Sequence, residues 1–257
     1  TGTLAATVGA LSVGLLGPIG RLTGLPRLTL IECSFGVYGL LALAAGALYR
    51  ALPDERVDSA APRTPLGPSR RNVFGLAALF SLDSFGSGFI VQSLFALWLF
   101  HRFGLSLAVA GGFFFWTGAL SAVSQLAAPV LARRIGLIRT MVFTHLPASL
   151  CVVAVAFAPN MQTAFVLLVV RALLSNMDVP ARTSYVMAVV TPAERAAAAG
   201  VTNVPRSLAS AFSPALSGLL FSLSPFAWPL VIGGSLKALY DLLLLWRFQK
   251  VRPPEET

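Results

Sequence analysis

Eight predominantly apolar runs follow one another along this chain, and no other feature of the sequence constrains its fold as strongly. They cover residues 3–20, 28–49, 73–99, 107–131, 138–158, 163–189, 196–222 and 227–248. A helix needs about 20 such residues to cross the ~30 Å hydrocarbon core of a bilayer. Backbone amides in lipid have no water to bind, so each run must be helical. The sequence therefore predicts an all-α, polytopic membrane protein with eight transmembrane helices in contact with the lipid bilayer.

Composition narrows the class of protein further. Apolar residues make up 56% of the 257 residues and charged residues 11%, against ~25% charged in a typical soluble domain. This excludes a soluble globular domain, a disordered chain and a disulfide scaffold. Cys33 and Cys151 lie inside apolar runs and are typical of small buried hydrophobic residues.

Motifs for other chemistry are missing from the sequence. Two histidines and two cysteines give no metal-ligand cluster, and no glycine-rich phosphate loop carries a lysine. We expect no cofactor, no bound metal and no enzymatic activity. An intramembrane enzyme built on Asp83 and Asp178 stays as a third hypothesis, although nothing in their spacing requires one.

The only hydrophilic connection, residues 50–72, is rich in proline, arginine and acidic residues, and it divides the chain. We expect residues 1–49 to form the last two helices of an N-terminal half-bundle. Residues 73–250 would form a C-terminal six-helix half-bundle, and 251–257 a cytoplasmic tail. Because the chain starts with Thr1 and a helix begins almost at once, we expect four helices to be missing at the front.

Basic residues predict the orientation, because loops on the cytoplasmic side carry the excess of lysine and arginine. If the linker is inside, only Arg21, Arg27 and Arg102 fall outside. Twelve basic residues then fall inside: Arg50, Arg56, Arg63, Arg70, Arg71, Arg133, Arg134, Arg139, Arg195, Arg247, Lys250 and Arg252. The net charge of +9 therefore reflects topology, and we expect no nucleic-acid partner. The predicted location is the inner (plasma) membrane, with the linker and both chain ends cytoplasmic.

Ionisable residues inside a membrane span are costly, so each is a functional candidate. Run 163–189 carries four polar residues within about 40° of Arg171, on either side of it, around an ideal helix: Ser175, Asp178, Arg182 and Tyr185. Such a stripe faces either a water-filled cavity or a partner helix, and both interpretations stay open. A proline at position 180 should kink this helix.

Two further runs carry polar groups at depth. Run 196–222 has Asn203 and Arg206 on one side, and Arg206 needs an anionic partner, for which Asp178 and Asp83 are candidates. In run 73–99, Asp83 lies roughly 15 Å along the helix, near Ser87 and two glycines. Asp83 is therefore either a proton or cation site or one half of a salt bridge.

The remaining runs are less polar. Gln125 shares an arc with three hydroxyl groups in run 107–131, which indicates either a cavity lining or helix–helix contact. His145 in run 138–158 is typical of a satisfied structural group. Lys237 and Asp241, four residues apart in run 227–248, are expected to pair with each other. The third and sixth helices of the half-bundle are thus predicted to face lipid while the others line a central cavity.

Several stretches resemble the major facilitator superfamily of secondary transporters. LDSFGSGFIVQSLFALWLF (82–100) and RALLSNMDVPARTSYVMAVVTPAERAAAAGVTNVPRSLASAFSP (171–214) are similar to the second half of a bacterial branch of this family. PVLARRIGLIRTM (129–141) resembles the family's loop signature, with Leu131, Arg134 and Gly136 matching and with Pro129 and Arg133 departing from it. GLLGPIG (14–20) partly resembles the Gly-Pro signature of proton-coupled antiporters.

The resemblance implies a secondary active transporter of the major facilitator type, working by alternating access. It implies a small-molecule substrate, H⁺ as the coupling ion, efflux as the direction and a monomer. A membrane scaffold or solute sensor of the same fold is the alternative. Candidate substrate, ion or coupling residues are Asp83, Ser87, Gln125, Arg171, Asp178, Arg182, Asn203 and Arg206; the candidate gating loop holds Arg133, Arg134 and Gly136.

Overall fold

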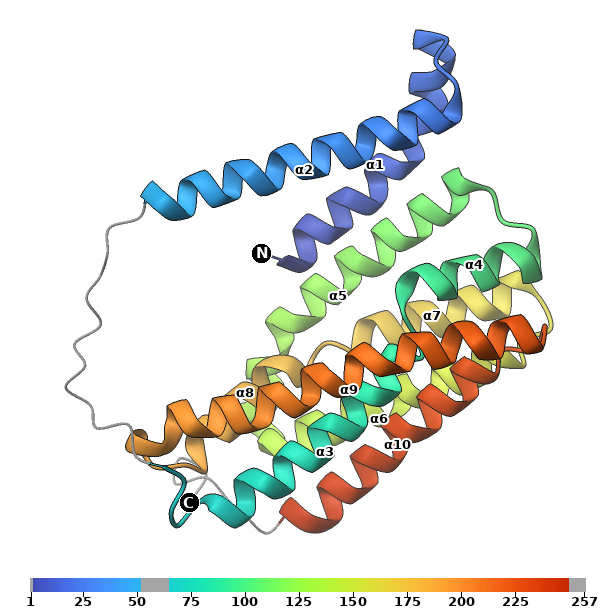
Figure 1. The fold of residues 1–257 in the computed structure, drawn as a ribbon. Coiled ribbons are helices and arrows are strands. Elements are labelled where there is room, and N and C mark those ends of the chain that lie inside the picture. Colours follow the sequence, from blue (N-terminus) through green and yellow to red (C-terminus); the bar gives the residue numbers. More distant parts are fainter. Residues whose placement is uncertain (1, 52–64, 250–257) are drawn as a thin grey trace.

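The computed structural model describes residues 2–51 and 65–249, without the side chains of 2–8, 10, 11, 13, 14, 27 and 107. The described part is helical and has no strand (Figure 1). Its α-helices are α1 (Gly2–Thr23), α2 (Arg27–Ala51), α3 (Arg70–Gly88), α4 (Gln92–Phe103), α5 (Leu107–Ile135), α6 (Leu137–Ala156), α7 (Met161–Leu174), α8 (Asp178–Ala188), α9 (Arg195–Leu223) and α10 (Trp228–Phe248). A short 3₁₀ helix, η1 (Pro192–Glu194), precedes α9.

The predicted all-α class is confirmed, and the chain is a polytopic helical membrane protein. Among the residues searched, six segments are long and apolar enough to cross a bilayer: Leu28–Ala51, Arg70–Phe103, Ala108–Ile135, Leu137–Ala156, Met161–Ala188 and Trp228–Phe248. Run 3–20 forms α1, but most of its side chains lie outside the described residues. Run 196–222 forms α9, whose serines and prolines leave it outside this set.

Two of the predicted spans are broken in the middle. Run 73–99 separates into α3 and α4 after Gly86 and Gly88. The amides of Phe89 and Ile90 turn back to carbonyls three residues earlier, and Val91 is extended at ψ 131°. The Ser217 hydroxyl of α9 donates to the carbonyl of Phe89 at 2.9 Å. The break therefore has a polar partner of its own, as a bend inside a bilayer requires.

The second break separates α7 from α8 at residues 175–177. A proline ring collides with the carbonyl four residues earlier. Pro180 therefore cannot continue the helix through Asn176, but it fits the first turn of α8, which starts at Asp178. The predicted kink is thus a complete break, placed before the proline.

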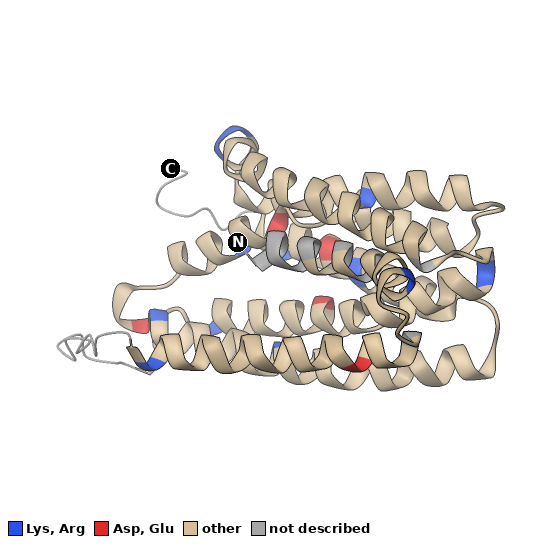
Figure 2. Cartoon of the chain, turned by 90° about the horizontal axis from the view of Figure 1, so that it is seen from above, with Lys and Arg blue, Asp and Glu red and all other residues tan. Residues whose placement is uncertain are grey.

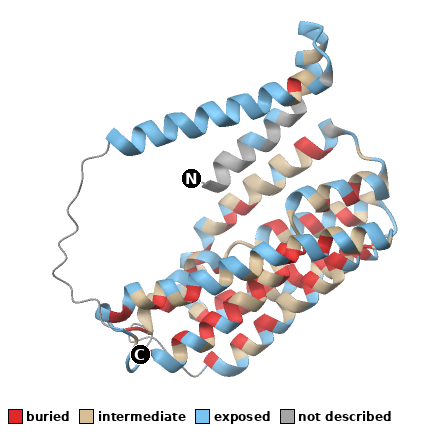
Figure 3. Ribbon diagram, in the orientation of Figure 1, coloured by how far each residue is buried: buried red, intermediate tan, exposed pale blue. Residues whose placement is uncertain are grey.

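Close helix packing builds the core. α3 packs against α9 and α10, α6 packs against α10, and α1 lies alongside α5. A Cβ atom at Gly88 would lie 1.8 Å from the Ser213 Oγ, and one at Gly233 would lie 2.7 Å from the carbonyl oxygen of Gly86. Figure 3 shows α2 exposed over most of its length, whereas buried residues gather in the bundle of α3, α6, α9 and α10. The helices that were predicted to face lipid, α6 and α10, are instead central to the packing of the described residues.

Two apolar clusters occupy opposite ends of the bundle. The first joins the start of α3 to the ends of α8 and α10, and includes Val73, Leu76, Met141, Tyr185, Leu244 and Phe248. The second lies around α4 and the start of α10, and includes Phe95, Trp98, Leu99, Val152, Val155 and Leu230. The middle of α3, α6 and α10 lies between the clusters, and the polar residues of these helices are found there.

The predicted linker 50–72 overlaps two helices, because α2 extends to Ala51 and α3 begins at Arg70. Residues 52–64, and the predicted tail 251–257, lie outside the described residues. The division into two half-bundles stays a prediction.

Candidate functional site

A layer of buried ionisable side chains crosses the middle of the bundle. Its members come from α3, α6, α8 and α10, and we call them the charge layer: Asp83, His145, Asp178, Arg182, Lys237 and Asp241. Charged residues are seen along the helices as well as at their ends (Figure 2). Asp83 is 3% exposed and Asp241 is fully buried, so these charges depend on each other rather than on water.

Asp83 lies at the centre of the charge layer. Its Oδ2 accepts a hydrogen bond from Arg182 Nη2 at 2.9 Å, and its Oδ1 accepts one from Lys237 Nζ at 2.7 Å. His145 Nε2 lies 3.6 Å from the same Oδ1. Lys237 also donates to the Ser87 hydroxyl at 2.6 Å. Three helices thus converge on one carboxylate, and the close approach at Gly86 and Gly233 lets Lys237 reach it.

Arg182 bridges two carboxylates. It pairs with Asp83 across the bundle and with Asp178 one turn earlier on α8. The guanidinium also lies over the rings of Phe80, at 5.0 Å, and Tyr240, at 5.8 Å. Within the described structure its Nε has no hydrogen-bond partner, and the aromatic faces compensate in part. The cationic neighbour of Asp178 is therefore Arg182.

His145 and Asp241 form the second part of the charge layer. The His145 Nδ1 lies 2.9 Å from both carboxylate oxygens of Asp241. The predicted pairing of Lys237 with Asp241 is wrong: Lys237 turns to Asp83, leaving Asp241 to the imidazole. Sequence reasoning missed all three residues as site candidates. The signal was there, because each sits near the middle of a span.

Arg206 does not pair with the acidic residues expected for it. Its Nε donates to the Ser84 hydroxyl at 2.9 Å, and no ion pair joins it to Asp83 or Asp178 in the described structure. Arg206 lines a small pocket of about 330 Å³ between α3 and α9, together with Ser87 and Asn203. Three of the predicted site residues therefore meet beside the charge layer.

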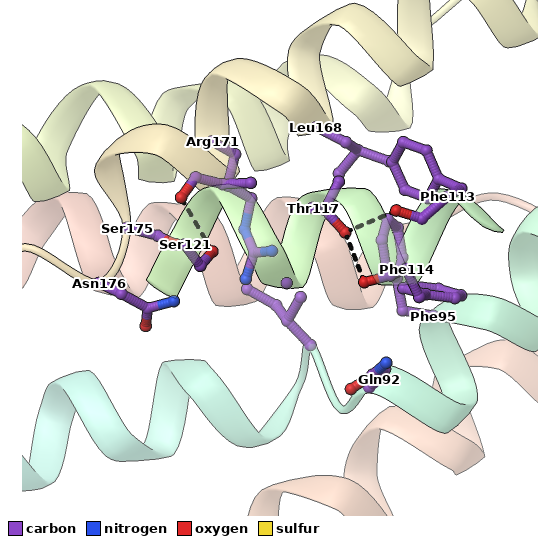
Figure 4. A pocket seen from close by; sticks show the side chains of 13 residues that line it. Gln92, Phe95, Phe113, Phe114, Thr117, Ser121, Leu168, Arg171, Ser175 and Asn176 are labelled. Carbon is purple, nitrogen blue, oxygen red and sulfur yellow. Dashed lines mark hydrogen bonds between the residues drawn. The ribbon is translucent and has the colours of Figure 1, made fainter. Parts of the chain in front are cut away.

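Arg171 lies apart from the charge layer. It lines a cavity of about 260 Å³ between α5, α7 and the two helix breaks (Figure 4). Gln92, Thr117, Ser175 and Asn176 give this cavity its polar wall, and Phe95, Phe113 and Phe114 give it an aromatic one. We call it the Arg171 pocket. The predicted stripe of run 163–189 is thus divided between two sites, with Tyr185 buried in the first apolar cluster.

The other predicted site residues lie elsewhere. Gln125 is half-buried on α5, outside the lining of both pockets. Arg133 and Arg134 are exposed at the end of α5, and Gly136, at φ 88°, makes the turn into α6. The candidate gating loop is therefore a helix–helix turn remote from the charge layer. Among the described residues, no group of three acidic, histidine or cysteine side chains could hold a metal ion.

A further buried carboxylate, Glu194, lies outside the spans. It accepts hydrogen bonds from the Ser69 hydroxyl at 2.7 Å, the Thr191 hydroxyl at 2.9 Å and the Gly67 amide. The hydrogen bond from Ser69, followed by that from Gly67, lowers the pKa of Glu194 to about 2. The segment that leads into α3 is thus fastened to the turn before α9. Sequence reasoning did not single out this residue.

These features define a class: a multi-pass helical membrane protein with a charged interior. No family model matches the chain. The chain is 25% identical over 174 residues to the Uncharacterized membrane protein YJR124C of Saccharomyces cerevisiae. The aligned residues make up 67% of this chain and 39% of the yeast protein, so the chain spans well under two thirds of that relative. The comparison supports a multi-pass membrane location.

Proposed function

We propose that this chain is part of a secondary active transporter of the major facilitator type, which exports a small solute in exchange for H⁺. The observation that carries the proposal is the Asp83 carboxylate held at mid-bundle by Arg182, Lys237 and His145. Buried ionisable networks of this kind mark ion and substrate pathways in membrane proteins. The two broken spans beside it support the same function, because broken helices surround the binding sites of many transporters.

The charge layer offers a physical basis for proton coupling. Asp83 faces Arg182 and Lys237, Asp178 faces Arg182, and His145 is the titratable group between Asp83 and Asp241. Gain or loss of a proton at His145 changes the net charge of this buried layer. A change of this size can bias the equilibrium between two conformations of a bundle.

Reconstitution tests the proposal. The full-length protein in proteoliposomes, with an imposed pH gradient, should move protons in response to one member of a panel of small organic solutes. Asp83→Asn should lose gradient-driven accumulation and keep downhill exchange, because the amide imitates a protonated carboxyl. Arg139→Ala, at an exposed position near the start of α6, is the matched control. Active transport by Asp83→Asn with an unchanged pH profile would contradict coupling at this residue.

A scaffold or solute sensor of the same fold is the alternative. It predicts ligand binding without solute flux in the same vesicles. An intramembrane enzyme would instead show turnover that needs no gradient and stops in Asp178→Asn. We propose that the protein is not an enzyme, because Asp83 and Asp178, the two acidic residues of that hypothesis, are held by Arg182 and Lys237.

The orientation proposed with this function places the linker, the turn at Gly136 and the C-terminus in the cytoplasm of the plasma membrane. Arginines near these helix ends support this orientation, because cytoplasmic loops carry the excess of basic residues. Arg247, at the end of α10, lies against Gly75, near the start of α3, so these two ends are on the same side of the bundle. Arg133→Cys, in a chain with Cys33 and Cys151 replaced by serine, should resist an impermeant thiol reagent in intact cells. Arg102→Cys should be labelled. The reverse pattern would invert the topology.

A further inference from the structure

Among the residues that the structure describes, Arg171 is a cation without an anion. Along the described chain, no carboxylate lies within ion-pair distance of its guanidinium, and it makes no hydrogen bond there. Arg182, on the same predicted span, pairs with two carboxylates. An arginine inside a bilayer is costly unless something compensates its charge. Arg171 therefore has the charge for a ligand and lacks a partner of its own.

The polar wall of the Arg171 pocket has hydrogen-bond donors that are unused within the described structure. The side-chain amides of Gln92 and Asn176 and the hydroxyl of Ser175 line the cavity and bond to no described group. Thr117 donates to the carbonyl of Phe113 at 3.0 Å, which leaves its oxygen free to accept. Figure 4 shows the guanidinium of Arg171 extended into the space between these groups. The donors and the positive charge suit an oxyanion with several acceptor atoms.

The break between α3 and α4 adds to this polarity. The first turn of α4 starts at Gln92, and no side chain caps it. Free backbone amides at a helix N-terminus favour a negative charge nearby. Ile90, in the break, and Gln92 both line the pocket, so this end of α4 opens on the same cavity as Arg171.

The other part of the lining is apolar and aromatic. Phe113 stacks on Phe165 with ring centroids 4.2 Å apart, which fixes the orientation of the ring. Phe95 and Phe114 complete the wall. A volume of about 260 Å³ is near the small end of ligand pockets, roughly 300–1,000 Å³. A compact molecule with one apolar, ring-like face and one anionic end fits both walls.

We propose that the Arg171 pocket binds a small organic anion, a carboxylate carried on an aromatic or alicyclic ring. Arg171 would hold the carboxylate with two parallel hydrogen bonds, Gln92 and Asn176 would donate to its outer lone pairs, and the ring would lie on Phe113. In the proposed transporter this molecule is the substrate, and for that role the inference rests on the proposed function. Binding itself requires no transport.

Equilibrium binding tests the site. Benzoate is titrated into the full-length protein in detergent at pH 7.5 and followed by calorimetry, with benzamide as the neutral isostere and benzylamine as the cation. Benzoate should bind, and the other two should bind at least ~10-fold more weakly, since each lacks the charge that Arg171 needs. Equal affinity for benzoate and benzamide would overturn the proposal, as would no binding of benzoate.

Variants locate the site. Arg171→Ala should weaken benzoate at least ~10-fold, and Arg171→Lys less so, because an ammonium keeps the charge without the planar fork. Phe113→Ala should weaken it through loss of the apolar wall. Arg139→Ala is the control for loss of a remote arginine. Unchanged affinity in Arg171→Ala would place the anion elsewhere; if that variant fails to fold, Gln92→Leu decides the same question.

The two proposals can fail separately. Benzoate binding that depends on Arg171, without solute flux in vesicles, would keep the site and refute the transporter. Flux of solutes that include no organic anion, together with no binding of benzoate, would keep the transporter and refute the site.

Discussion

Two arginines on one predicted span, Arg182 and Arg171, have opposite surroundings. Arg182 is 7% exposed, is held by Asp83 and Asp178, and lies over two aromatic rings. Arg171 lines a cavity with amides, hydroxyls and phenylalanines and has no described anion within reach. The helix break at residues 175–177 separates them. The same residue type is thus fully paired within the protein at one position and lines an unfilled cavity at the other.

The comparison distinguishes charges that are paired within the protein, as in the charge layer, from a charge that is available to a ligand, as in the Arg171 pocket. A buried ion pair contributes little net stability compared with apolar residues of similar volume, but removal of one partner is expensive because the other charge is left unpaired. The charge layer should therefore react strongly to single substitutions and weakly to paired ones. The Arg171 pocket should react little in stability and strongly in binding.

The largest expected effect is that of Arg182→Leu. Asp83 keeps Lys237, but Asp178 loses its cation, and the full-length protein should lose ~3–5 kcal/mol of stability. Thermal unfolding in detergent, followed by tryptophan fluorescence, measures this. Glu32→Gln, at an exposed site on α2, should leave the midpoint unchanged. A midpoint for Arg182→Leu equal to the wild type would show that the charge layer is not held by its ion pairs.

A double replacement refines that prediction. Asp83→Asn leaves Lys237 without its anion, and Lys237→Met leaves Asp83 with Arg182 and His145. Each should destabilise by ~2–4 kcal/mol, and the pair together by less than the sum of the two. Additive losses in the double-mutant cycle would contradict direct coupling at 2.7 Å.

A smaller effect comes from the packing that lets the charges meet. A methyl group at Gly88 would collide with Ser213, so Gly88→Ala should cost ~1–3 kcal/mol through overpacking. Gly112→Ala, in α5 where a Cβ meets nothing within 4 Å, should be neutral or stabilising by up to ~1 kcal/mol. The same thermal unfolding compares them. Equal midpoints would mean that α3 and α9 separate easily at this point.

Much of this fold follows from the sequence, and much of the site does not. Apolar runs and the cost of bare amides predict the helices, and Pro180 predicts a disruption near residue 176. Which side chains pair between helices cannot be predicted from a single amino-acid sequence. Lys237 and Asp241 have helical spacing for a mutual pair, yet α10 approaches α3 and α6 so closely that each finds a better partner across the bundle. Partners set by tertiary approach override those set by local spacing.

The carboxylate of Glu194 provides a case held by neutral donors alone. Because its pKa is lowered to about 2 from an ordinary value of 4.5, it stabilises the folded state fully above pH 4.5, and that contribution is lost as the pH falls toward 2. Glu194→Gln should lower the unfolding midpoint by a few degrees at pH 7. It should also flatten the dependence of the midpoint on pH between 4.5 and 2. Thr191→Val, which removes one hydrogen-bond donor of Glu194, should cause a smaller decrease in the unfolding midpoint. If the midpoint depends on pH in the same way in the wild type and in Glu194→Gln, the segment before α3 is held by other contacts.

The smallest expected effect on stability is that of Arg171→Leu. The replacement removes a charge that no described carboxylate balances and adds a shorter, apolar side chain in a cavity that Leu168 also lines. The desolvation cost of the guanidinium disappears while no ion pair is lost, so stability should change by less than ~1 kcal/mol and can rise. Thermal unfolding without ligand measures this against Arg182→Leu in the same detergent. With benzoate present, the wild-type midpoint should rise and that of Arg171→Leu should not, because only the wild type gains binding energy in its folded state. A loss for Arg171→Leu as large as that for Arg182→Leu would mean that Arg171 also holds the bundle together, and the contrast between the two arginines would fail.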